Sequence, residues 1–137
     1  MIIQEALADC IMKFEGWYAP SVTVPKGSTS WRNRNPGNLR DSIYRAGEDD
    51  KGYATFDTLS SGWTALTHDI YFKLSGKSSH LLTPQNTLHD FFNIYAPYMD
   101  HNDPQHYTKM VASWLCLIYN TNLITPDTKL EDLVKFK

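Results

Sequence analysis

The stretch from residue 17 to residue 57 limits most strongly what this chain can fold into, because proline and glycine interrupt it throughout. Proline removes the backbone N–H that a helix interior needs, and glycine has the largest conformational entropy to lose. The breakers are Pro20, Pro25, Gly27, Pro36, Gly37, Gly47 and Gly52. We therefore expect an irregular lobe with short strands, most favourably a hairpin of 38–44 and 52–56 around a polar turn at 46–51.

Helical patterns flank this lobe on both sides. Apolar residues at steps of three and four predict a first helix over 2–16, which Gly16 ends. The same spacing predicts later helices over 58–74, 87–95, 104 to about 118, and 130–136. Thr58 or Ser60 is expected to cap the helix over 58–74, and Asp103 precedes Pro104 as the N-cap of the helix that starts at 104. The pattern indicates a mostly α fold of the α+β class, a helical bundle with a small irregular or β-hairpin lobe inserted after the first helix.

The size of the chain fits one domain over residues 1–137, since 137 residues lie near the modal domain length. Its aromatic content of 13% exceeds what a core of this size needs, so we expect part of it to line a ligand site. The other part is expected to build the hydrophobic core, because these residues lie on helical faces. They are Phe14, Trp63, Phe91, Phe92 and Trp114, together with Leu66.

Charge and termini exclude several classes. The net charge of −2 provides no overall attraction to nucleic acid or to an anionic membrane. The first helix has neither a basic leader nor a cleavage site, so we expect synthesis in the cytoplasm without a signal peptide, and no membrane span. The histidines show no metal-binding spacing, so neither a metal nor a cofactor is expected. Cys10 and Cys116 are interpreted as small buried residues, with a disulfide between them as the alternative.

Glu15 is the strongest candidate for chemistry. It lies at the end of the first predicted helix beside Phe14, Trp17 and Tyr18. Apolar neighbours desolvate a carboxylate and raise its pKa, as a general acid near neutral pH requires. On the residue pattern alone, a solvated surface glutamate is the more common interpretation of such a position.

Asn and Arg side chains crowd the segment 31–40, around the turn at Pro36 and Gly37. Such side chains offer donors and acceptors for the hydroxyl and acetamido groups of a sugar. Interleaved with Trp31, they also fit single-stranded nucleic acid, and a hydrogen-bonded structural loop is the third possibility. Tyr95 and Tyr107 in the later helices form a weaker third candidate group.

Four separate motifs, in this order and spacing, resemble the lysozyme-like muramidase and lytic transglycosylase domains of bacteriophage virion and tail proteins and of related bacterial proteins. The resemblance spans residues 3 to about 120. The motifs are Phe14-Glu15-Gly16, the run from Arg32 to Arg40, Tyr53-Ala54-Thr55-Phe56 with Gly62-Trp63-Thr64-Ala65-Leu66, and Tyr95-Ala96-Pro97 followed by Asn102-Asp103-Pro104 and Tyr107.

The resemblance implies a lysozyme-like fold and cleavage of the β-1,4 bond between N-acetylmuramic acid and N-acetylglucosamine in peptidoglycan. It implies that Glu15 is the catalytic acid, that Asn38 and Arg40 face the sugar, and that Tyr107 approaches the acid. Peptidoglycan glycan strands are the expected partner, with virion or secretion-device proteins for delivery to the cell wall. Stacking of sugar rings is our hypothesis for the remaining aromatic residues: Trp17, Tyr18, Trp31, Tyr53, Tyr95, Tyr98 and Tyr107.

The mechanism depends on a second carboxylate. A hydrolase needs one near Glu15, either as a nucleophile or as a base for water. The lobe offers Asp41, Glu48, Asp49, Asp50 and Asp57, and spacing selects none of them. A lytic transglycosylase needs no second carboxylate, and we favour it slightly. The alternative to an enzyme is a non-catalytic virion structural or glycan-binding module that retains the cleft.

Overall fold

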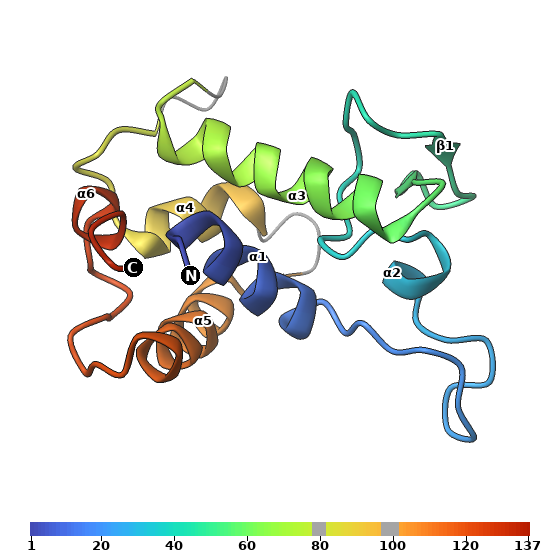
Figure 1. Ribbon diagram of the computed structural model, residues 1–137, viewed down its shortest axis with the longest axis horizontal. Helices are drawn as coiled ribbons and strands as arrows, with labels where there is room; N and C mark the ends of the chain where they lie inside the picture. Colours follow the sequence, from blue (N-terminus) through green and yellow to red (C-terminus); the bar gives the residue numbers. More distant parts are fainter. Residues whose placement is uncertain (78–81, 97–101) are drawn as a thin grey trace. The chain divides into compact units, whose positions relative to one another are not determined.

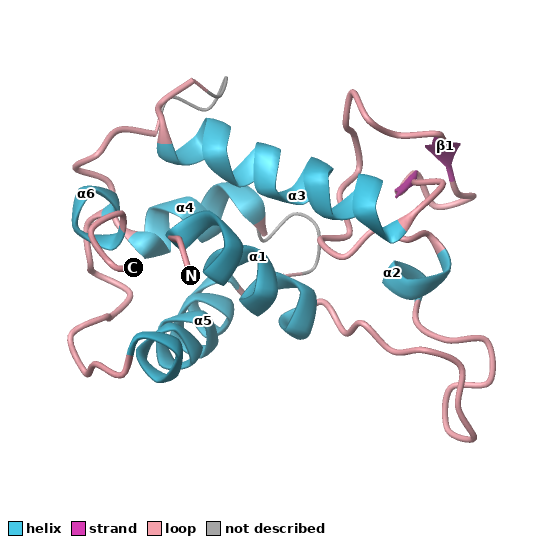
Figure 2. Cartoon of the chain, viewed as in Figure 1, coloured by secondary structure: helices cyan, strands magenta, loops and turns pink. Residues whose placement is uncertain are grey.

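The computed structural model describes residues 1–77, 82–96 and 102–137, and they are mostly helical (Figure 1). The helices are α1 (Ile3–Phe14), α2 (Thr29–Arg32), α3 (Leu59–Leu74), α4 (Leu88–Tyr95), α5 (Pro104–Tyr119) and α6 (Leu130–Leu133). The strands β1 (Gly47–Glu48) and β2 (Ala54–Thr55) form one antiparallel hairpin. The predicted mostly α fold of the α+β class is confirmed. Loops dominate between α1 and α3, as Figure 2 shows.

The chain forms two compact units. One, the bundle unit, consists of Met1–Cys10 and Ile70–Lys137, and it contains α4, α5 and α6. The other, the loop unit, consists of Ile11–Asp69 and contains α2 and the hairpin. The predicted irregular lobe therefore lies in the loop unit.

The end of α1 and the start of α3 lie where the sequence signals predict them. Gly16 follows α1 with a φ of +77°, in the left-handed region that glycine adopts without strain. Thr58 precedes α3, and its Oγ1 accepts a hydrogen bond from the backbone N–H of Ser61 over 3.0 Å. Of the two predicted caps, Thr58 rather than Ser60 therefore performs this function.

The later helices agree with their predicted ranges except at the last one. Thr87 and Asp90 form a capping box at the start of α4, and Asp103 caps α5 by accepting from the backbone N–H of His106. Helix α6 ends at Leu133 instead of continuing to residue 136. Helix α2 was not predicted, because one turn is too short to show a period.

The predicted hairpin is wrong in its first strand. Residues 38–44 form no strand, and β1 lies at Gly47–Glu48, within the predicted turn. Asp49 explains the difference, because its Oδ1 accepts from the backbone N–H groups of Lys51 and Tyr53 over 2.9 Å each. These bonds close a tight turn directly after β1, and Gly47 then pairs with Thr55.

Each unit has its own apolar centre. In the loop unit, Ala54, Phe56 and Ala65 form a small buried cluster against which Leu39 packs. In the bundle unit, Phe91 and Phe92 are fully buried, as predicted. The other expected core residues divide: Leu66 is buried, whereas Phe14, Trp63 and Trp114 are only partly buried.

The cysteines do not form the alternative disulfide. Cys10 is buried, as predicted, and Cys116 is only half-buried. Among the described residues, no helix has the length and apolar character that crossing a membrane requires.

Candidate active site

Glu15 directly follows α1 and is half-buried. Its backbone N–H donates to the carbonyl of Ile11 over 2.8 Å, which extends the helical hydrogen bonding by one residue. The chain then turns away at Gly16, where a Cβ atom would lie 3.1 Å from the ring of Tyr18. The left-handed backbone angle favours glycine here, and a larger residue would also need the exposed Tyr18 ring to shift slightly.

Asn38 supplies a hydrogen-bond donor to Glu15. Its Nδ2 lies 3.3 Å from Oε1 of Glu15, although 23 residues separate the two in sequence. Because an ionised carboxylate only accepts, the amide nitrogen must face Glu15. Asn38 has a φ of +48°, a conformation that asparagine tolerates better than most residues. Its Oδ1 is buried and has no hydrogen-bond partner among the residues described.

The loop that carries Asn38 is fixed by the fully buried side chain of Asn35. The Asn35 amide nitrogen donates to the carbonyls of Leu39 and Ala54 over 2.8 and 2.9 Å, and its Oδ1 accepts from the Leu39 N–H over 2.9 Å. These bonds join residues 35 and 39, which lie on either side of Asn38 in the chain, and so fix the loop that contains it. For Asn35 the interpretation of the Asn-rich segment as a hydrogen-bonded structural loop is correct, although the sequence did not single out this asparagine.

The same segment docks on α3 through Gly62. A Cβ atom at this position would overlap the carbonyl oxygen of Arg34 and lie 3.0 Å from Cδ of Pro36. Arg34 has a φ of +50°, so the backbone turns sharply at the contact. Glycine is therefore needed at position 62 because the backbone of the Asn-rich segment approaches α3 closely there.

Arg40 and Tyr53 form a pair. The Arg40 guanidinium carbon lies 4.4 Å from the centre of the Tyr53 ring, and Nη1 donates to the carbonyl of Lys51 over 3.0 Å. Arg40 is exposed and Tyr53 half-buried. One face of Tyr53 is therefore covered by a cation, which makes that face unavailable to a sugar ring.

Trp31 lies in α2 and is half-buried. Ser28 caps this short helix by accepting from the Trp31 N–H over 3.3 Å. A Cβ atom at Gly27 would lie 2.8 Å from the Trp31 ring, so that glycine makes room for the indole. The hydrogen bond to Ser28 and the contact with Gly27 place Trp31 within its own part of the loop unit.

Tyr95 and Tyr107 belong to the bundle unit, where they lie together. Tyr107 is fully buried, with its ring stacked on Phe92 at 4.6 Å and 6.3 Å from the Tyr95 ring. A fully buried side chain offers no face to a sugar, so the predicted stacking of a sugar ring on Tyr107 is contradicted. Tyr95 is half-buried, with the Lys73 ammonium 5.7 Å above its ring. Tyr98, which was also predicted, lies outside the described residues.

Three of the five carboxylates in the lobe have donors of their own. The Asn33 amide, 2.9 Å from Oδ2 of Asp49, holds the pKa of the Asp49 carboxyl below its ordinary value, and the N–H groups of Tyr53 and Lys51 add to this against the effect of burial. Asp41 and Glu48 lie 3.4 and 3.7 Å from Nη1 of Arg45. The remaining two, Asp50 and Asp57, are exposed.

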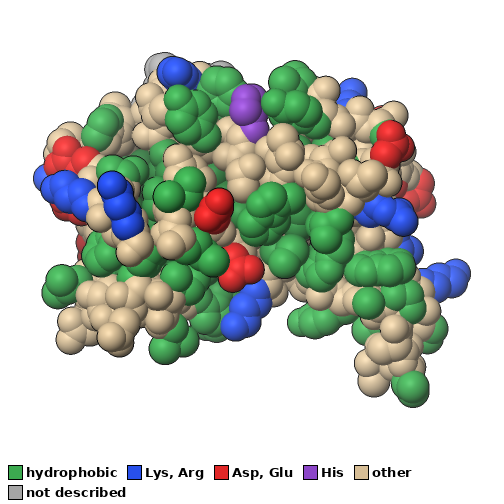
Figure 3. Space-filling view, in the orientation of Figure 1, with side chains coloured by type: hydrophobic (Ala, Val, Ile, Leu, Met, Phe, Trp, Pro, Cys, Tyr) green, Lys and Arg blue, Asp and Glu red, His purple; other side chains and the backbone are tan. Residues whose placement is uncertain are grey.

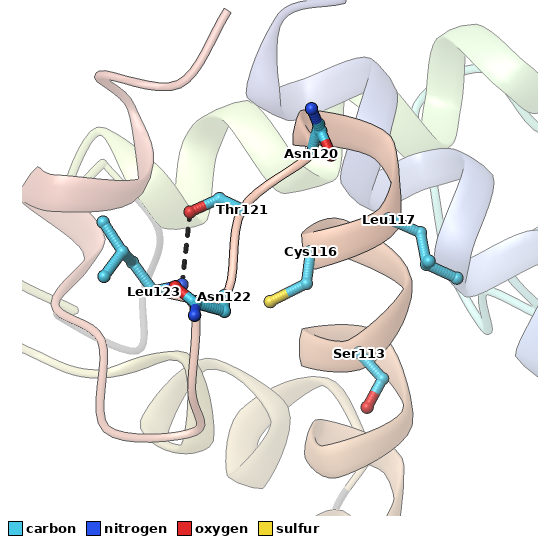
Figure 4. A pocket seen from close by; sticks show the side chains of 7 residues that line it. All are labelled: Ser113, Cys116, Leu117, Asn120, Thr121, Asn122 and Leu123. Atoms are coloured by element: carbon cyan, nitrogen blue, oxygen red, sulfur yellow. Dashed lines mark hydrogen bonds between the residues drawn. The ribbon is translucent and has the colours of Figure 1, made fainter.

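Hollows also occur in the bundle unit. One of about 600 Å³ is lined by α5 and the loop after it, with the Cys116 sulfur directed toward that loop (Figure 4). Cys116 Sγ donates weakly to the carbonyl of Ile124 over 3.3 Å. This hollow contains none of the predicted site residues. No group of three potential metal ligands occurs among the described residues.

Comparison with known proteins returned no match to a family model, a curated protein or a solved structure. The candidate site therefore depends on its own geometry, which brings Glu15 to Asn38 and Arg40 to Tyr53 within the loop unit. On the face in Figure 3, Lys and Arg side chains occur together with Asp and Glu, without forming a patch of one sign.

Proposed function

We propose that this protein cleaves peptidoglycan glycan strands at the β-1,4 bond between N-acetylmuramic acid and N-acetylglucosamine, with Glu15 as the general acid. The observation that carries the proposal is the hydrogen bond from Asn38 to Glu15. It joins two of the four motifs that carry the resemblance to lysozyme-like domains. A carboxylate held by a neutral donor at a helix end keeps a defined direction, which proton transfer to a glycosidic oxygen requires.

Lytic transglycosylation is the favoured reaction. Glu15 protonates the oxygen that leaves C1 of the muramoyl residue, and the C1–O bond breaks. The resulting carboxylate then removes the proton of the muramoyl C6 hydroxyl, whose oxygen bonds to C1 and gives a 1,6-anhydro product. The hydrogen bonds and ion pairs of Asp49, Asp41 and Glu48 within the lobe support a mechanism without a second carboxylate.

The test is digestion of purified sacculi by wild-type protein and by Glu15→Gln, with the soluble products identified by mass spectrometry. Glutamine keeps an oxygen that accepts from Asn38 but holds no transferable proton, so muropeptide release should fall at least about a thousandfold, the upper part of the usual contribution of acid–base catalysis. Glu5→Gln is the matched control, because Glu5 is an exposed residue of the same helix and its change removes the same charge.

The products decide between the two reactions. Terminal anhydro-muramic acid supports transglycosylation, and reducing muramic acid ends identify a hydrolase instead. Binding of wild-type protein to sacculi with no release would contradict the enzyme and favour a glycan-binding or virion structural module. Because the substrate lies outside the cytoplasm, delivery by a virion or secretion device is part of the proposal.

A further inference from the structure

We propose that Arg40 is a specificity residue that binds a carboxylate of the glycan substrate, and this inference rests on the function proposed above. A neutral polymer of N-acetylglucosamine has no group of this kind. Peptidoglycan has carboxylates on its lactyl groups or on its stem peptides. Arg40 would thus let the site select peptidoglycan from neutral glycans.

The first support is that the Arg40 guanidinium is held in place. It lies over the Tyr53 ring at 4.4 Å and donates through Nη1 to the carbonyl of Lys51. Gly52 lies beside it, and a Cβ atom there would be 3.4 Å from Nη1 of Arg40, an ordinary contact distance. An arginine that is ordered before binding loses less side-chain entropy when it captures an anion.

The second support is that Arg40 keeps its charge uncompensated. No carboxylate of the described residues forms an ion pair with it, and its side chain is exposed. A guanidinium has five N–H donors, and the bond to Lys51 uses only one nitrogen. The other donors can form the paired hydrogen bonds that planar carboxylates accept.

Arg45 provides the internal comparison. It has the same side chain in the same unit, but Asp41 and Glu48 both lie within 4 Å of its Nη1. Its charge is therefore already balanced by the protein. Arg40 follows Asn38 by two residues and so lies on the loop that contacts Glu15, which places the uncompensated cation in the same segment as the hydrogen-bond partner of the candidate acid.

The experiment measures binding by calorimetry in the Glu15→Gln background, in which ligands are not consumed. Three ligands are compared: neutral chitohexaose, peptide-free glycan strands with free lactyl carboxylates, and glycan strands that keep their stem peptides. The additional variants are Arg40→Gln, Arg40→Lys and, as the matched control, Arg45→Gln. Thermal unfolding verifies that each variant is folded.

We expect Arg40→Gln to weaken binding of a carboxylate-bearing strand about tenfold and of chitohexaose less than about twofold, as for loss of one charge-assisted contact at an exposed site. Arg40→Lys should retain part of the affinity, and Arg45→Gln should bind as its parent does. A loss confined to peptide-free strands identifies the lactyl carboxylate, and a loss confined to peptide-bearing strands identifies the peptide. An equal loss for all three ligands, or no loss, overturns the inference.

Activity of the otherwise wild-type protein separates this result from the proposed function. If sacculi are cleaved and Arg40→Gln changes the affinity for all three ligands equally or not at all, the inference about Arg40 is wrong and the function stands. If neither cleavage nor glycan binding occurs, the function itself is wrong.

Discussion

Asn33 donates a hydrogen bond from Nδ2 to Oδ2 of Asp49 over 2.9 Å and thereby ties the end of α2 to the turn of the hairpin. The bond favours the ionised form of Asp49, which also accepts from two backbone N–H groups. Folding therefore holds this carboxyl ionised at pH values where the unfolded chain would bind a proton.

The first prediction concerns acid stability. Because the pKa of Asp49 is lower in the folded chain than its ordinary value of 3.8, its contribution is fully present above that value and is lost as pH falls through the folded pKa. Below about pH 4 the stability of wild-type protein should therefore approach that of Asp49→Asn. Thermal unfolding at a series of pH values measures the difference, with exposed Asp57→Asn as control. Parallel curves for wild type and Asp49→Asn would contradict the assignment.

A second prediction addresses the partner of Glu15. In Asn38→Asp the amide donor that orients Glu15 is lost, so the carboxyl no longer keeps a defined direction, and release of muropeptides should fall by at least about tenfold, or 1.4 kcal/mol in the barrier. Asn38→Gly keeps the left-handed backbone accessible and should lose less activity.

The control for both Asn38 variants uses Asn120, which has a φ of +50° at the end of α5 and is exposed. Asn120→Asp and Asn120→Gly repeat the two substitutions in the same backbone conformation and should leave activity unchanged. Full activity of Asn38→Asp would show that its bond to Glu15 has no part in the reaction.

The third prediction tests how the Asn-rich loop docks on α3. Alanine at position 62 favours a helix by about 1 kcal/mol relative to glycine, yet its Cβ atom would overlap the carbonyl of Arg34. We expect Gly62→Ala to lower the free energy of unfolding by about 1 to 3 kcal/mol, as overpacking does. Denaturant titration measures it, and Ser60→Ala at an exposed position of α3 should be nearly neutral.

The fourth prediction concerns the capping box of α4. Thr87 Oγ1 accepts from the Asp90 N–H over 3.2 Å, and Asp90 Oδ2 accepts from the Thr87 N–H over 2.9 Å. Thr87→Ala should cost about 1 kcal/mol of stability, whereas Thr87→Ser keeps the hydroxyl and should cost less. Equal losses in the two variants would show that the methyl group, not the cap, matters there.

Local signals explain which parts of the fold were predictable. The long helices show apolar periodicity, and Asp103 before Pro104 marks the start of α5 from neighbouring residues alone. The first strand of the hairpin has no such signal. Its place depends on the Asp49 side chain closing a turn, which competes with the strand propensity of residues 38–44.

In the candidate site, too, the features with a local sequence signal were predictable and the three-dimensional contacts were not. Glu15 and Asn38 were both predicted, and their contact became visible only in three dimensions because 23 residues separate them. Asn33 and Asn35 were in the predicted segment, but nothing local distinguishes an asparagine that holds backbone from one that faces a ligand. The pairing of Arg40 with Tyr53 likewise depends on how the hairpin folds.

The bonds of Asn35 affect how the loop should respond to deuterated water. A surface loop normally exchanges its amide protons quickly, since water reaches them. Here the Leu39 N–H donates to a fully buried side chain, and the Ala54 N–H donates to the Leu39 carbonyl. Slow exchange at these two amides would show that a segment without helical structure, organised around one asparagine, is protected from exchange as well as a helix is.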